Sequence, residues 1–273
     1  CCTGQGVNIG IIDDGIDDNH SVFSNTDFGE MLDFSNPPGY LYGAEHEDNI
    51  GHGTGTASII VGDPGTWEDH GWLWQFIPDD VPEEYLTGQF DAFTGVAPDA
   101  TLHVYKIFPG GQPASIAGIE RTMDPNGNCG DDLLSLPVRD FCFEDHLDVV
   151  NCSWGSPGYP LNHPGSIAAG AAVDVGVTMV FSAGNAGPGA PTNSSWQSYV
   201  LPGNPADGYQ TVGCPGCNPK VITVGATKKY SPLWSDGGTT GGTLDGTIAS
   251  YSSRGPTWPI YDGSEETYDK PDI

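Results

Sequence analysis

Two residues placed beside short hydrophobic runs could do chemistry in this sequence. Asp13 directly follows the apolar run 7–12, and His52 stands among glycines and threonines just before the apolar run 59–61. A carboxylate at the end of a buried strand can orient an imidazole at the start of a packed helix, so that the imidazole accepts a proton from a nucleophilic hydroxyl. The pattern favours the acid and base of a nucleophilic site. The alternative for His52 is an incidental position in a glycine-rich turn.

A third candidate is the side-chain amide of Asn185. It lies in the glycine-flanked turn 182–187, at the end of a predicted strand at 177–183. Such an amide could donate to a developing oxyanion, an interaction typically worth about 2.7–4 kcal/mol. An ordinary asparagine–glycine turn is the alternative. The turn at 153–155 would leave exposed backbone groups along which an extended peptide could pair.

The elements that must position these residues alternate along the chain. Strands are expected at 7–12, 101–108, 147–153, 177–183 and 221–225, and helices at 52–62, 114–123 and 166–175. This alternation predicts a three-layer, doubly wound α/β fold with a mostly parallel sheet covered on both faces. Functional residues gather at the carboxyl ends of the strands in such sheets, so Asp13 and the turns near 153 and 183 should share one edge.

The chain is expected to be one domain, residues 1–273, because it contains no internal repeat and no linker. Residues 16–50 are polar and turn-rich. Insertions are predicted near 63–95, 124–146 and 192–210. The first of them carries several aromatic residues and could form part of a binding cleft.

The net charge and the cysteines limit the classes of protein to which this sequence can belong. The sequence holds 8 Lys+Arg against 36 Asp+Glu, a net charge of −28, which excludes a general affinity for nucleic acid. No apolar run approaches the roughly 20 residues of a membrane span. Among the seven cysteines, Cys129 could pair with Cys142 and Cys214 with Cys217, while Cys152 is expected as a buried thiol. An oxidising compartment is therefore favoured, which predicts an extracellular or cell-surface location.

A loop starting at Asp124 alternates oxygen-bearing side chains as calcium loops do. Asp124, Asn126 and Asn128 are its candidate ligands. The loop lacks a glycine at the sixth position and a bidentate glutamate at the twelfth. The alternative is an acidic turn closed by a Cys129–Cys142 disulfide. A calcium-dependent adhesion module would depend on this loop and on the net charge alone.

Several motifs occur in a fixed order along nearly the whole chain. They are Gly10-Ile-Ile-Asp-Asp-Gly15, Gly51-His52-Gly-Thr54, Asn151-Cys-Ser-Trp-Gly155, Ser182-Ala-Gly-Asn-Ala-Gly187, Ser252-Ser-Arg-Gly-Pro256 and Lys270-Pro-Asp-Ile273. In this order and context the chain resembles the subtilisin-like serine proteases. The wording of the motifs is most similar to that of large bacterial extracellular members.

The resemblance implies roles for individual residues. Asp13 would be the catalytic acid, His52 the general base and Asn185 the oxyanion donor. Ser153, Trp154 and Gly155 would line one side of the substrate channel, Gly110 and Gly111 the other, and Ala183 and Gly184 the wall of the specificity pocket. Asp14 stands where many members have Ser or Thr. The chemistry would need no cofactor, although a structural calcium ion is compatible with it.

The largest departure from the family is the absence of its serine motif. In the family the order is Asp, His, then Ser, and the serine lies in a Gly-Thr-Ser motif some tens of residues beyond the segment that matches 270–273. No Gly-Thr-Ser occurs in this sequence. The fold is therefore expected to be incomplete at its C-terminal side, with the serine on the missing part of the same domain.

The resemblance thus predicts a secreted serine endopeptidase that cleaves polypeptides through an acyl-enzyme. Its partners would be polypeptide substrates and the missing C-terminal part of its own domain, with no nucleic acid and no membrane span. The alternative is a catalytically inactive relative, kept as a binding or structural component of a cell surface or filament. An inactive relative would have little reason to keep Asp13, His52 and Asn185 together.

Overall fold

The computed structural model describes residues 2–35, 48, 50–63, 94–125, 145–156, 162–187, 211–227, 248–255, 257 and 268–273. The chain divides into two compact units, Cys1–Val150 and Asn151–Ile273. Strand β4 (Val149–Cys152) contributes residues to both of them. The expectation of a single domain stays a prediction, and its three insertions lie largely outside the described residues.

The first unit is built on β1 (Asn8–Asp13), β2 (Asp27–Asp33), β3 (Thr101–Lys106) and the first half of β4. These strands follow the order β2-β3-β1-β4. β3 pairs in parallel with both β1 and β2. The helical elements are η1 (Ser21–Phe23), α1 (His52–Val61) and α2 (Gly111–Met123).

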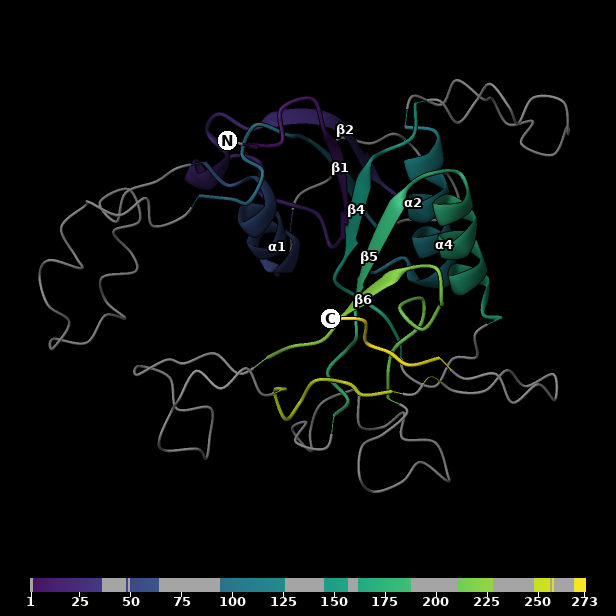
Figure 1. Ribbon diagram of the computed structural model, residues 1–273. Coiled ribbons are helices and arrows are strands. Elements are labelled where there is room, and N and C mark those ends of the chain that lie inside the picture. Colours follow the sequence, from purple (N-terminus) through teal and green to yellow (C-terminus); the bar gives the residue numbers. More distant parts are fainter. Residues whose placement is uncertain are drawn as a thin grey trace, which may run out of the picture. The chain divides into compact units, whose positions relative to one another are not determined.

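Strand β1 is buried on both faces from Ile9 onward, as its largely apolar sequence predicts. Ile9 and Ile11 belong to a core cluster that includes Ala57 and Val61 of α1. Helix α2 packs closely enough on β1 that a Cβ on Gly118 would lie 3.3 Å from a methyl group of Ile12. Figure 1 shows α1 and α2 on opposite sides of β1. The predicted three-layer arrangement is therefore present in this unit.

Strand β2 lies within the stretch predicted to be polar and turn-rich. The pairing of β2 with β3 shifts register between Phe28 and Met31, which interrupts the alternation of buried and exposed residues along the strand. The strand also carries three acidic residues. The acid in the middle, Glu30, is paired by the guanidinium of Arg121 on α2, and the Tyr105 hydroxyl donates to it at 3.2 Å. An edge strand tolerates such charges because one side of its backbone is unpaired.

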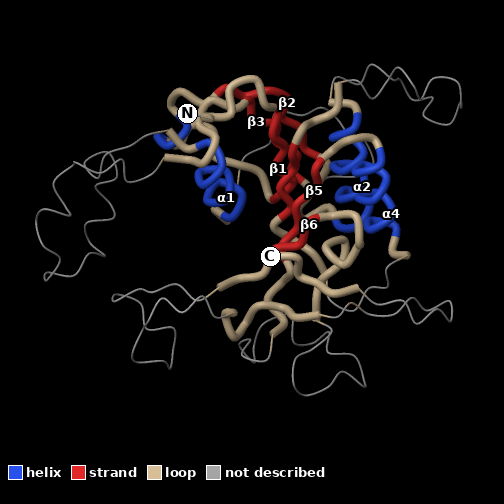
Figure 2. Tube along the Cα trace, in the orientation of Figure 1, coloured by secondary structure: helices blue, strands red, loops and turns tan. Residues whose placement is uncertain are grey.

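The second unit holds the rest of β4 together with β5 (Thr178–Ser182), β6 (Ile222–Val224) and α4 (Pro164–Asp174). The strand order is β4-β5-β6, and β5 and β6 are parallel. Figure 2 shows that much of the remaining described chain in this unit is loop.

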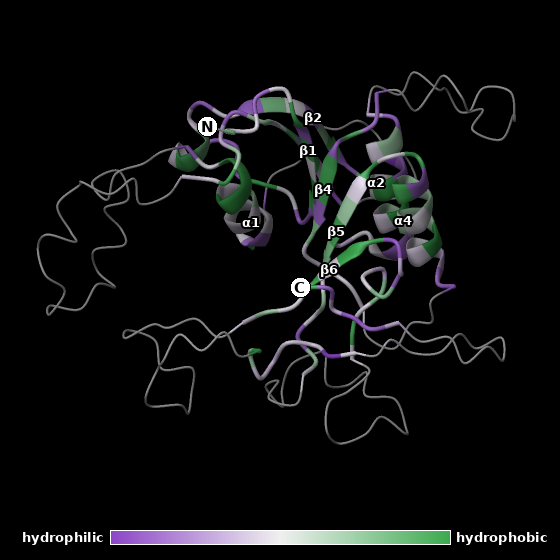
Figure 3. Cartoon of the chain, viewed as in Figure 1, coloured by the Kyte–Doolittle hydropathy of each residue, from purple (hydrophilic) through white to green (hydrophobic). Residues whose placement is uncertain are grey.

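The hydropathy of the residues follows the elements of each unit. Figure 3 shows hydrophobic residues along β6 of the second unit and along much of α1 of the first.

Two of the cysteine predictions are confirmed. Cys214 and Cys217 form a disulfide, and Cys152 is buried at the end of β4. Cys129 and Cys142 lie outside the described residues. Where the structure describes the chain, its helices are all too short or too polar to cross a membrane.

Candidate active site

Asp13 is the last residue of β1 and is 3 % exposed. The strand places it at the carboxyl end of the parallel sheet of the first unit, after the fully buried Ile11 and Ile12. Burial keeps water from competing for the carboxylate, so its hydrogen bonds must come from protein groups. This position is the one that the sequence pattern predicted.

His52 opens α1 and is hydrogen-bonded to Asp13. Its Nδ1 lies 2.7 Å from Asp13 Oδ1, and its side chain is 49 % exposed. This hydrogen bond raises the pKa of His52 above 6.5, although partial burial acts in the opposite direction. With Nδ1–H directed at the carboxylate, the neutral imidazole keeps the lone pair of Nε2 for an incoming proton.

Asp14 stabilises the N-terminal end of α1 through a hydrogen bond to its backbone. Its Oδ1 accepts a hydrogen bond from Gly53 N at 2.7 Å, and its own backbone N–H donates to Asp13 Oδ1 at 2.8 Å. Burial raises the pKa of Asp14 to about 6, which the Gly53 hydrogen bond opposes. The Oδ2 atoms of Asp13 and Asp14 are buried and have no hydrogen-bonding partner among the described residues.

Asp48 is a residue of the site that the sequence interpretation missed. Its carboxylate accepts hydrogen bonds from Ile50 N at 2.9 Å, Gly51 N at 2.6 Å and Thr54 N at 3.0 Å. Burial raises its pKa, but the hydrogen bonds from the Thr54 side chain and these backbone groups outweigh that effect and lower it. An acidic residue just before a helix start is a capping signal and could have pointed to Asp48.

Gly53 explains why this helix begins among small residues. A Cβ at this position would lie 1.9 Å from the carbonyl oxygen of Gly15. Any side chain would therefore push α1 away from the strand end that carries Asp13. Gly51, just before the helix, has φ +85°, a left-handed conformation that favours glycine. The glycine at 53 therefore lets this helix approach its neighbours closely.

The second unit contains the turn that carries Asn185. Asn185 is exposed, whereas Ala183, Ala186 and Gly187 around it are buried. Ala183 N donates to Val224 O at 2.8 Å, and Ala183 O accepts from Gly213 N at 2.9 Å. The turn is thus held by backbone bonds at its start while the candidate oxyanion donor faces outward.

The predicted channel residues Ser153, Trp154 and Gly155 lie in the same unit. Ser153 Oγ accepts a hydrogen bond from Asn151 Nδ2 at 3.0 Å, and Trp154 packs edge-on against Phe181 with ring centres 5.5 Å apart. The next residue, Ser156, pairs antiparallel with Cys214. Because Gly213 bonds to Ala183, segment 211–214 connects this strand end to the Asn185 turn.

Gly110 and Gly111 belong to the first unit, where they begin α2. Gly110 is the N-cap residue and Gly111, with φ +71°, is the first helical residue. The structure therefore brings Asp13 together with His52 in one unit. In the other unit it brings the Asn185 turn together with residues 153–156 through their shared neighbours.

Comparison with known proteins decides the family. A model of the subtilase family matches residues 4–273. The chain belongs to the subtilase family. Subtilases are serine endopeptidases, and the matched residues include both Asp13 and His52.

The subtilase relatives include two proteases of Bacillus subtilis (strain 168). The minor extracellular protease Vpr is 30% identical over 237 residues, which are 83% of this chain and 21% of Vpr. The serine protease AprX is 26% identical over 280 residues, 99% of this chain and 46% of AprX. The chain thus spans less than half the length of either relative.

Solved structures show the same fold. Sphericase superposes with a TM-score of 0.58 at 22% sequence identity, over 98% of this chain and 73% of that structure. The predicted α/β fold of the subtilisin-like type is therefore confirmed.

The subtilase reaction uses protein side chains and needs no cofactor. Asp124, the first candidate calcium ligand, is the C-cap residue of α2, and Asn126 and Asn128 lie outside the described residues. The calcium prediction therefore stays a prediction. Among the described residues, the group that could bring metal-binding atoms within 4.8 Å of one another is Asp13, Asp14 and His52. Their hydrogen bonds to each other and to α1 favour proton transfer instead.

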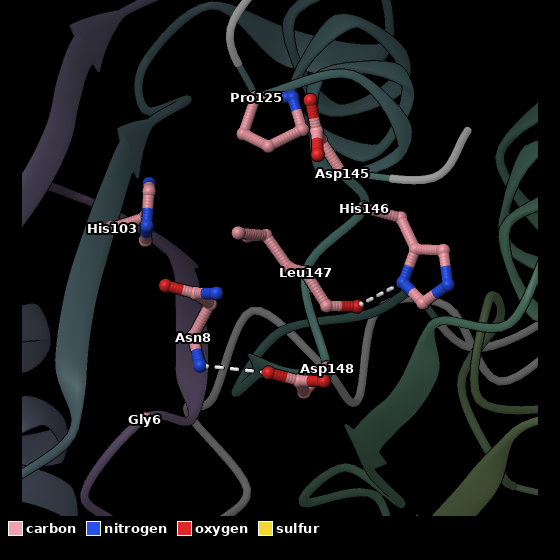
Figure 4. Close-up of a pocket in the computed structure, with 8 residues that line it drawn as sticks. All are labelled: Gly6, Asn8, His103, Pro125, Asp145, His146, Leu147 and Asp148. Carbon is pink, nitrogen blue, oxygen red and sulfur yellow. Dashed lines mark hydrogen bonds between the residues drawn. The ribbon is translucent and has the colours of Figure 1, made fainter. Parts of the chain in front are cut away.

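A cavity of about 370 Å³ lies elsewhere in the first unit (Figure 4). It adjoins Asn8, the first residue of β1, whereas Asp13 ends that strand, about 16 Å away at about 3.3 Å per residue. Two of the polar side chains that line it have backbone partners: Asp148 Oδ2 accepts from Asn8 N, and His146 Nδ1 lies 2.9 Å from Leu147 O. We assign no ligand to this cavity.

Proposed function

We propose that this chain provides the acid and base of a secreted serine endopeptidase, with Asp13 as the acid and His52 as the base. The observation that carries the proposal is the 2.7 Å hydrogen bond between Asp13 Oδ1 and His52 Nδ1, in a chain of the subtilase family. A buried carboxylate bound to the inner nitrogen of a half-exposed imidazole fits a base that faces substrate on its other side.

The reaction begins with attack of a serine Oγ on the scissile carbonyl carbon. His52 Nε2 takes the hydroxyl proton as the new C–O bond forms, and the carbonyl electron pair moves onto its oxygen. Asp13 stabilises the imidazolium that results. Collapse of the intermediate breaks the C–N bond, and the proton passes from Nε2 to the leaving amine. A water molecule then repeats the sequence on the acyl-enzyme, with His52 again the base.

Asn185 is proposed as the side-chain donor to the oxyanion. Its exposed position on a turn fixed by backbone bonds supports this role, because an oxyanion donor must be preorganised and yet face the substrate. Ala183 and Gly184 would then border the pocket for the residue before the scissile bond. Ser153, Trp154 and Gly155 would pair with the substrate backbone, and Gly110 and Gly111 are proposed as further residues of the substrate channel.

The serine is proposed to lie in a segment that follows residue 273 in the full-length protein. In the family it comes after the aspartate and the histidine, and residues 1–273 contain no Gly-Thr-Ser. Secretion is supported by the Cys214–Cys217 disulfide, since disulfides persist in oxidising compartments.

A fluorophosphonate probe tests the proposal on the full-length, processed protein. We expect covalent labelling at a single serine, and we expect His52→Ala to abolish it because the hydroxyl loses its base. His146→Gln is the matched control, because among the described residues His146 bonds only to a backbone carbonyl. This variant should be labelled as the wild type is. Absence of labelling in the processed wild-type protein would favour the alternative, an inactive subtilase that serves as a binding or structural component.

A further inference from the structure

Ser253 lies in the Ser-Ser-Arg-Gly-Pro motif, to which the proposed mechanism gives no role. We propose that Ser253 is a positioning residue that holds the backbone of the Asn185 turn in the shape the oxyanion donor requires. The inference rests on the proposed function of Asn185. It is independent of the source of the nucleophile.

Ser253 bonds to the residues on both sides of Asn185. Its backbone N–H donates to Gly184 O at 2.9 Å, and its Oγ accepts from Ala186 N at 3.0 Å. Asn185 is thus bracketed by two hydrogen bonds from a single residue that lies far along the chain. A side chain whose two flanking peptides are both fixed has little freedom to drift.

Packing beneath the turn makes the serine difficult to replace. Ser253 is 1% exposed, and its Oγ would lie 3.0 Å from a Cβ placed on Gly184. Gly184 itself has φ +100°, which favours glycine there. The hydroxyl therefore fits closely under the turn, and loss of its oxygen would leave the buried Ala186 N–H without its acceptor.

The neighbouring Ser252 provides a matched comparison. It is also 1% exposed, and its Oγ also accepts a backbone N–H at 3.0 Å. That N–H belongs to Ala226, in the segment after β6, and not to the Asn185 turn. The two serines therefore have equal burial, and their hydroxyl oxygens accept the same kind of bond from different segments; the Ser252 hydroxyl also donates to Ser253 O at 3.5 Å.

The experiment is a double-mutant cycle in the full-length, processed enzyme, with kcat and KM measured on a chromogenic peptide amide. Asn185→Ala should lower kcat by about 10²–10³-fold, as expected for loss of an oxyanion donor. Ser253→Ala should lower kcat by about tenfold to a hundredfold with KM little changed, the scale expected when a catalytic group is misplaced. Ser252→Ala should leave kcat near the wild-type value.

Coupling between the two sites decides the proposal. If Ser253 acts through Asn185, adding Ser253→Ala to Asn185→Ala should produce no further loss of kcat. Full additivity of the two losses, or an equal loss in Ser252→Ala, would show that Ser253 only supports the fold. A wild-type kcat in Asn185→Ala would also overturn the inference, but fluorophosphonate labelling that still depends on His52 would leave the proposed endopeptidase standing.

A second pair of variants covers the case in which Ser253→Ala does not fold. Ser253→Thr keeps a strong hydroxyl acceptor, whereas Ser253→Cys fills the site with a weak one. We expect the threonine variant to retain kcat and the cysteine variant to lose it. The reverse order, or equal values of kcat, would contradict a role for the Oγ hydrogen bond.

Discussion

The buried carboxyl group of Asp14 makes the Asp13–His52 pair sensitive to the pH of the medium. Its pKa is raised by burial from 3.8 to about 6, so the folded protein holds this proton at pH values where the unfolded chain releases it. The stability that Asp14 contributes is therefore fully present below pH 3.8 and is lost as the pH rises through about 6. Above that range its charge also raises the pKa of His52.

Replacement of Asp14 by asparagine should separate these effects. An asparagine oxygen can still accept from Gly53 N, but it carries no buried charge. We expect Asp14→Asn to stabilise the protein at about pH 8 by on the order of 1 kcal/mol, because the weaker Gly53 hydrogen bond and solvent screening offset part of the gain, which should vanish towards about pH 4. The acid limb of kcat/KM should also move to lower pH, because the pKa of His52 falls. Denaturation and pH–rate profiles measure both.

The exposed Asp17 provides the control for this substitution. Asp17→Asn should leave the pH dependence of stability and of kcat/KM unchanged. A stability difference between wild type and Asp14→Asn that stays constant with pH would mean that the Asp14 carboxyl group is not the source.

Sequence reasoning singled out Asp13, His52 and Asn185 as candidates because each follows or precedes a hydrophobic run that marks an element boundary. It did not point to the contacts of Asp48 or of Ser253. Asp48 lies four residues before the first residue of α1 and acts through backbone N–H groups, a weak signal in the sequence, and Ser253 bonds to a residue 67 positions away. Contacts of these two kinds are set by tertiary structure.

At the scale of elements, two glycines in the first turn of α1, Gly53 and Gly55, differ in the space available for a side chain. A Cβ on Gly53 would collide with the carbonyl oxygen of Gly15, whereas a Cβ on Gly55 would have nothing within 4 Å. Gly55 is exposed and lies inside the helix. One glycine is therefore required by packing, and the other only adds flexibility to the unfolded chain.

Alanine substitution should distinguish the two glycines. We expect Gly55→Ala to raise the free energy of unfolding by about 0.5–1 kcal/mol. Gly53→Ala should lower it by about 1–3 kcal/mol or more, since a backbone carbonyl cannot swing aside, and should reduce labelling by displacing His52. Urea denaturation with fluorophosphonate labelling measures both outcomes. Equal effects of the two substitutions would contradict the packing argument.

Sequence patterns predicted α1 and the central strands better than β2. A central parallel strand such as β1 is apolar on both faces and leaves an unbroken signal. β2 carries charge in its middle and a register shift, and its Glu30 is paired by Arg121 from α2. A partner on another element cannot be read from the strand's own residues.

For the whole molecule, the excess of negative charge opposes folding in a way that no single contact displays. With 36 acidic against 8 basic residues, the net charge of −28 repels itself in the folded state. Salt shortens the range of this repulsion from about 10 Å at 0.1 M to about 3 Å at 1 M. The folded state should therefore gain stability as salt is added.

Thermal denaturation in increasing sodium chloride tests this expectation. The Tm should rise between about 0.05 M and about 1 M salt as screening relieves the repulsion. The rise should shrink near about pH 4, where most carboxyl groups approach their ordinary pKa values and lose charge. A Tm that falls with salt, or a response independent of pH, would mean that specific ion pairs outweigh the net charge.

The capping of α1 has a consequence for protein design. The first N–H groups of this helix are bound by the carboxylates of Asp14 and Asp48, both of which lie outside the helix. Transplanting the helix sequence alone would carry the histidine into a new scaffold without the groups that aim it. The smallest transferable module is discontinuous: residues 13–15, residue 48 and residues 51–54, with the glycine at 53 included so that the parts can meet.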